Sequence, residues 1–230
     1  MKALIESQEF ILVLIFGSYL LGQWVFKKTK IAVFHPLIIA TAIIILYIYI
    51  SDISVAKFEK GSQIISFMLG PSVVALGYIL YEQINYLKGN LIPILTSLAI
   101  GSVTAVVSVI LLARLMGADE VLIMTLEPKS VTAPIAMSIS AQTGGIPALT
   151  GVIVLFCGIF GGIVGPYILK ILHIESHTAK GLAMGASSHG IGTARAMEMG
   201  VIEGALSGLA IGLMGVMTAL LIPFVHKILL

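Results

Sequence analysis

Charged residues are scarce along this chain. Only 10% of its 230 residues are Asp, Glu, Lys or Arg, whereas a soluble domain carries about 25%. Apolar residues make up 58%, and the mean hydropathy is +1.10. This composition predicts an integral membrane protein with the lipid bilayer as its surroundings. The net charge of +2 is too small to indicate a nucleic-acid partner.

The chain also lacks the motifs of common catalytic and metal sites. It has no phosphate-binding loop, no nucleophile elbow and no framework of zinc ligands. His173 and His177 have the spacing of a helical metal pair, but no third ligand is evident, so a solvated connector is the simpler interpretation. Its one cysteine, Cys157, excludes an internal disulfide. We therefore expect no enzymatic activity, no cofactor and no bound metal.

Long apolar runs indicate the membrane spans. A span needs about 20 apolar residues, and runs of this kind occupy 9–26, 31–50, 63–84, 91–113, 146–172 and 204–226. Two further segments, 119–142 and 178–199, have helical length but are interrupted by proline, glycine and polar residues. The sequence thus predicts one all-α transmembrane domain over residues 1–230. We expect about six transmembrane helices plus two broken or re-entrant segments; eight full crossings is the alternative.

The distribution of lysine favours re-entrant segments over full crossings. Three lysines follow the first span, at positions 27, 28 and 30, so that loop is expected in the cytoplasm. If 119–142 dips into the membrane and returns, Lys170 and Lys180 fall on the cytoplasmic side, as the lysine rule prefers. If it crosses fully, these two lysines lie outside. The two broken segments would then enter from opposite faces, which is typical of transporters.

The first broken segment combines helix-breaking prolines with a cation. Pro128 and Pro134 interrupt the helix, and Lys129 lies at membrane depth, where a charge needs a partner or an anionic ligand. Ser130 and Thr132 add hydroxyl groups beside it. We predict a carboxylate-binding pocket here, and the alternative is a lysine that snorkels to the interface.

The second broken segment carries an arginine after two glycines. Gly190 and Gly192 are expected to break the helix, and Thr193 to begin a half-helix whose N-terminus faces an anion. The planar guanidinium of Arg195 can donate two parallel hydrogen bonds to a carboxylate. The alternative is a structural ion pair between Arg195 and Glu198 or Glu203, or a position at the cytoplasmic surface.

Other polar residues of the two segments complete the predicted site. Ser187, Ser188 and His189 are expected to hydrogen-bond the solute. His189 can also relay a proton, because its charge changes near neutral pH; a plain hydrogen-bonding role is the alternative. Glu127 is a second candidate for proton coupling, or pairs with Lys129, or lies at the outer surface.

Glycines follow one face of the last span. They recur at intervals of four, four and three residues, at Gly204, Gly208, Gly212 and Gly215. Small faces let helices approach closely in lipid. Packing inside the chain and a homodimer seam both explain the pattern, and we expect a homodimer.

Both broken segments resemble a known family. The stretches 128–136 (PKSVTAPIA) and 144–150 (GGIPALT), with 179–185 (AKGLAMG) and 188–196 (SHGIGTARA), look like the signature of the LrgB/CidB family. Length and span order also fit, and the chain resembles the stand-alone bacterial form of the CidB and YohK-like branch. The family often has a hydroxyl and a second proline after the third-span proline, where this chain has Val73 and Ile79. That departure weakens the expectation of a third break at Pro71.

The resemblance implies two kinds of function in the bacterial inner membrane. One is transport of small monocarboxylates, because relatives include pyruvate uptake systems and the plastid glycolate/glycerate translocator. The other is a holin/antiholin-like role that modulates murein hydrolase activity and autolysis, with a small LrgA/CidA-type membrane partner. From the polar residues themselves we expect a secondary carboxylate transporter first, and the holin-like component as the alternative.

Overall fold

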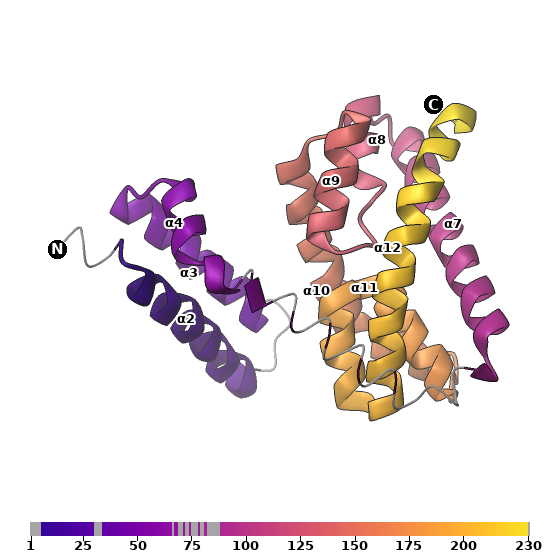
Figure 1. Ribbon diagram of the computed structural model, residues 1–230, viewed down its shortest axis with the longest axis horizontal. Coiled ribbons are helices and arrows are strands. Elements are labelled where there is room, and N and C mark those ends of the chain that lie inside the picture. The colour runs from indigo at the N-terminus through magenta and orange to yellow at the C-terminus, as the bar shows by residue number, and fades with distance from the viewer. Residues whose placement is uncertain are drawn as a thin grey trace. The chain divides into compact units, whose positions relative to one another are not determined.

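A computed structural model describes residues 6–29, 34–65, 67–68, 71, 74, 78, 81 and 88–229 (Figure 1). Every element in these residues is a helix, and the chain divides into two compact units, Met1–Ala75 and Leu76–Leu230. That residues 1–230 form a single domain stays a prediction.

The first unit packs three helices: α2 (Gln8–Thr29), α3 (Pro36–Ser51) and α4 (Val55–Gly61). Close approach between α2 and α3 depends on Gly22, where an added Cβ would lie 2.7 Å from the carbonyl oxygen of Pro36. Pro36 starts α3, where its missing N–H costs nothing.

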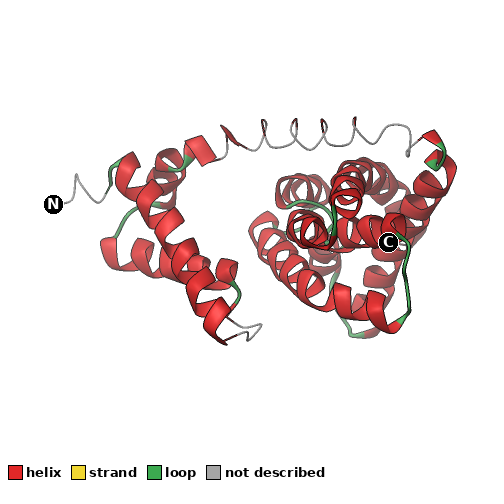
Figure 2. Ribbon diagram, turned by 90° about the horizontal axis from the view of Figure 1, so that it is seen from below, coloured by secondary structure: helices red, strands yellow, loops and turns green. Residues whose placement is uncertain are grey.

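The second unit contains α7 (Leu91–Leu115), α8 (Glu120–Leu126), α9 (Ala133–Thr143), α10 (Pro147–Ile171), α11 (His177–Met199) and α12 (Val201–Leu229). Its core forms where one face of α7 meets α12: Ile94, Leu98 and Val106 are buried together with Leu206 and Met214. Figure 2 shows these elements joined by short loops.

Among the described residues, four helices are long and apolar enough to cross a membrane: α2, α7, α10 and the Val201–His226 part of α12. Helix α3 is apolar but has 16 residues, fewer than a span needs. Most of the predicted span 63–84 lies outside the described residues; Pro71 itself is helical and exposed, while its neighbours Gly70 and Ser72 are not described. The protein is an all-α, multi-pass membrane protein.

The first discontinuous segment leaves α8 and returns beside it. The helix stops at Leu126 and restarts at Ala133, after an extended Thr132. Pro134 occupies the first turn of α9, so it opens a helix. The main-chain N–H of Ile146 then donates to the Thr125 hydroxyl at 2.9 Å, which brings the chain back to the end of α8. The chain between these points therefore leaves the end of α8 and comes back to it, the path that a re-entrant segment requires.

The second discontinuous segment is α11, which doubles back at His189. This residue has φ 40° and ψ −127°, and it is the one non-helical position inside α11. An added Cβ at Gly192 would strike the carbonyl oxygen of Met184, eight residues earlier, so the two arms lie against each other. The break is therefore at His189, and the prediction that Gly190 and Gly192 break the helix is wrong. Gly192 instead supplies the small surface that lets the arms meet.

Candidate functional site

Lys129 lies in the turn between α8 and α9, and it is half-buried. Its Nζ donates to the hydroxyl of the buried Ser130 at 3.0 Å. Among the described residues no carboxylate forms an ion pair with it. Pro128 before it is buried. The turn thus holds a cation whose charge is not compensated by a neighbouring carboxylate, which is the state that an anionic ligand requires.

His189 forms the tip of α11, and it is 5% exposed. Its ring hydrogen-bonds the backbone of Val154 on α10. Within the described part of the chain its Nε2 has no hydrogen-bond partner. A buried polar atom without a partner is costly, so this nitrogen is a candidate contact for a solute.

Both discontinuous segments pack against α10. The charge of Lys129 acts on both His189 and Cys157 of α10. Room for the tip comes from two glycines of α10: an added Cβ at Gly158 would lie 2.5 Å from His189 Cε1, and one at Gly161 would strike the Ser188 hydroxyl. The structure therefore brings Lys129, Ser130, Ser188 and His189 into one neighbourhood.

Three other predicted residues have different surroundings. Arg195 forms an ion pair with Glu198 on the exposed side of α11, as the structural alternative predicted. Thr193 does not begin a half-helix: it is buried, and its hydroxyl shares a 2.7 Å hydrogen bond with Ser207 of α12. Ser187 is exposed and donates to the carbonyl of Ala183 at 2.7 Å.

Thr132 stands at the start of α9, where it is half-buried. It is the N-cap residue, yet its side chain makes no capping hydrogen bond. Its hydroxyl is therefore not used to cap α9, and Thr132 stands three residues after Lys129 in the chain.

Glu127 neither pairs with Lys129 nor lies at the surface. It is 0% exposed, and its two carboxylate oxygens lie 2.7 and 2.8 Å from Nε2 of His226 near the end of α12. Sequence reasoning missed His226. The two residues stand 99 positions apart, and no local pattern connects them.

A second His–Glu pair joins the start of α11 to the start of α12. His177 Nδ1 lies 2.6 Å from Oε1 of Glu203, which is 3% exposed. His177 is therefore more than a solvated connector residue. Over the described ranges, no group of three His, Cys, Asp or Glu side chains is placed to hold a metal ion.

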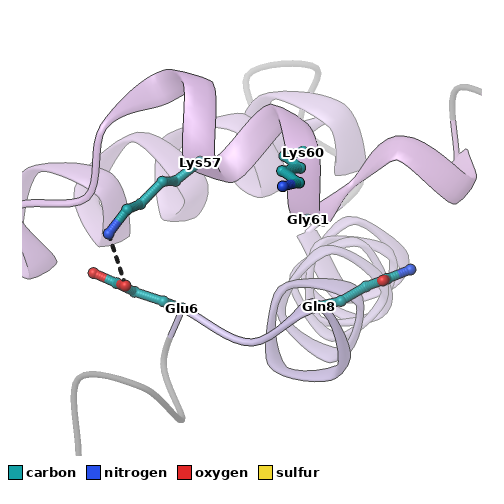
Figure 3. Close-up of a pocket in the computed structure, with 5 residues that line it drawn as sticks. All are labelled: Glu6, Gln8, Lys57, Lys60 and Gly61. Atoms are coloured by element: carbon teal, nitrogen blue, oxygen red, sulfur yellow. Dashed lines mark hydrogen bonds and ion pairs between the residues drawn. The ribbon is translucent and has the colours of Figure 1, made fainter.

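A surface hollow in the first unit is unrelated to these residues. It has a volume of about 310 Å³ and is lined by Glu6, Gln8, Lys57, Lys60 and Gly61 (Figure 3). The Nζ of Lys57 and a carboxylate oxygen of Glu6 form an ion pair of 2.9 Å there. With exposed lysines and one satisfied pair, it is an open polar surface.

Fold and site together define a multi-pass, all-α membrane protein in which two discontinuous segments meet. Residues 16–228 match the LrgB-like family. Over 207 residues the chain is 33% identical to proteins named antiholin-like protein LrgB from Bacillus mycoides, Bacillus cereus and Bacillus anthracis, covering 90% of this chain and 90% of each relative. No solved structure matches the chain. The chain belongs to the LrgB-like family, as the resemblance indicated.

Proposed function

We propose that this protein is an antiholin-like component of a bacterial inner membrane that modulates murein hydrolase activity together with a small LrgA/CidA-type membrane partner. The observation that carries the proposal is the family membership, with relatives of matching length that bear the antiholin-like name. The protein would act by associating with its membrane partner and carry out no chemical reaction.

The test is made in bacteria lacking this protein, its partner, or both. Autolysis rate and hydrolase activity of the envelope are measured after each gene is restored, and the tagged protein is purified from gently solubilised membranes. The proposal expects the partner to copurify and the autolysis effect to need both proteins. Normal regulation by this chain in cells without the partner would contradict it.

A second candidate is carriage of small monocarboxylates such as pyruvate, glycolate or glycerate. It is favoured by the meeting of Lys129 and His189 at the ends of two broken segments, because such ends surround midplane solute sites in transporters. Lys129 would neutralise the carboxylate, while Ser130, Ser188 and His189 Nε2 would hydrogen-bond it. Arg195 is paired elsewhere and is no longer assigned to this site.

The carrier is tested by uptake of the three labelled acids into liposomes that hold the purified protein. Saturable uptake that is lost in Lys129→Ala, and kept in Lys170→Ala, would support it. Lys170 is a matched control because it stands in the last turn of α10, outside the meeting point. If no uptake is seen either with or without the partner protein, the carrier function is excluded and only the assembly role remains.

The homodimer stays a proposal, and the structure narrows where its seam would lie. Gly204 packs against Met197 and Gly215 against Ile135, so these two glycines serve contacts inside the chain. Gly212 has no atom within 4 Å of an added Cβ. We expect Gly212→Leu to weaken self-association in detergent, as measured by light scattering.

A further inference from the structure

Helix α12 carries a His–Glu pair at each end. Near its start, Glu203 lies 2.6 Å from His177; near its end, His226 lies 2.7 Å from Glu127. At about 1.5 Å per residue, the helix between positions 203 and 226 is about 35 Å long. The hydrocarbon core of a bilayer is about 30 Å thick. The two pairs therefore lie near opposite faces of the membrane.

Each pair attaches one discontinuous segment to α12. His177 is the first residue of α11, and Glu127 is the residue at which α8 ends and the Lys129 turn begins. In Figure 1, α8, α9 and the C-terminal end of α12 gather at one end of this unit, and α11 lies at the other. Helix α12 therefore anchors both discontinuous segments, in each case through one histidine and one glutamate.

Both glutamates depend on histidine for a charged partner. Glu203 and Glu127 are buried, and each has a single ion-pair partner among the described residues. Lys180 on α11 also acts on the charge of Glu203, whereas His226 is the one described residue whose charge acts on Glu127. Four other charged groups lie on the elements around Glu127: Lys129 bonds Ser130, and Arg114, Asp119 and Glu120 are exposed.

We propose that these pairs are two proton-binding sites, one at each membrane face, and that protonation of each histidine fixes the attached segment to α12. A protonated imidazole forms an ion pair with the buried carboxylate, which adds a charge–charge attraction that a neutral imidazole lacks. Because the two pairs lie near opposite faces of the membrane, the proton of each pair exchanges with the compartment on its own side. This role goes beyond both functions proposed above and is compatible with either.

The test is hydrogen–deuterium exchange of the full-length protein in lipid nanodiscs at pH 6 and pH 8, corrected for intrinsic exchange rates. We expect amide protection over 120–132 and over 177–182 to fall by roughly tenfold at the higher pH, because the charge–charge attraction of each pair is lost. His226→Gln should remove the pH dependence of the first stretch only, and His177→Gln that of the second only.

His173→Gln is the matched control, since His173 lies in the connector just before α11, is exposed and has no ion pair among the described residues. It should change neither stretch. Glu127→Gln and Glu203→Gln provide second variants that keep a hydrogen bond without the charge. In vesicles with one verified orientation, a pH change on one side should alter one stretch alone. Equal protection at both pH values in the unaltered chain, or pH dependence that survives both histidine variants, would overturn the proposal.

Discussion

His189 at the tip of α11 sits directly against Gly158 of α10. A single Cβ added at position 158 would come within 2.5 Å of the imidazole Cε1 and 3.2 Å of Nδ1. Because His189 is buried and its main chain is non-helical, the ring has little freedom to move aside. The glycine therefore sets where the tip of the second discontinuous segment lies.

Replacing this glycine should displace the tip. We expect Gly158→Ala to lower the free energy of unfolding by about 1–3 kcal/mol, the usual cost of overpacking, and to shift the NMR signals of the His189 ring. Both are measured on the purified protein in mild detergent. Gly101→Ala is the control, because Gly101 of α7 has no atom within 4 Å of an added Cβ; there, alanine should stabilise the helix slightly. Equal effects of the two variants would show that position 158 has room.

The Thr193–Ser207 hydrogen bond should be a structural tie between α11 and α12. Both hydroxyls are buried, so Thr193→Val leaves the Ser207 hydroxyl without its partner. We expect a loss of about 1 kcal/mol in stability, since hydrogen bonds between membrane helices are modest, measured by unfolding in a denaturing detergent. Thr193→Ser keeps the hydroxyl and should lose much less. If instead Thr193 served the solute site, valine would abolish uptake without lowering stability.

Lys129 should influence which reagents react with Cys157, the one cysteine in the chain. Because the lysine charge acts on this thiol, an anionic thiol reagent should react faster than a cationic reagent of the same size. Lys129→Gln should reduce that preference by roughly tenfold, which corresponds to about 1.4 kcal/mol of charge interaction. Rates are measured by mass spectrometry in membranes. Lys170→Gln is the control, and an equal change in that variant would indicate a general surface-charge effect.

The sequence predicts the breaks well, because prolines and charges within apolar runs are local signals. The prediction around Lys129 rests on Pro128 and on the cost of a membrane-embedded charge, and the structure has the helix interrupted there. The second break was predicted in the right segment but at the wrong residues. Glycine permits a break without requiring one, and here Gly192 is used for close packing.

The partners of the charged residues follow from tertiary packing and cannot be predicted locally. Arg195 had a carboxylate three residues away, so its pairing with Glu198 was a visible alternative. His226 and Glu127 meet only because the last helix returns to the end of α8. The same holds for His189, whose surroundings are supplied by Val154 and Gly158 of another helix.

The most direct test of the account is whether the turn that carries Lys129 lies beside α10. Lys129→Cys places a second thiol near Cys157, and a short bifunctional thiol reagent is applied to intact membranes. The account predicts a cross-link within one polypeptide, detected after proteolysis between the two positions, and none in a Lys170→Cys control. Failure of Lys129→Cys to cross-link, while both thiols react with a monofunctional reagent, would contradict the position of the Lys129 turn beside α10.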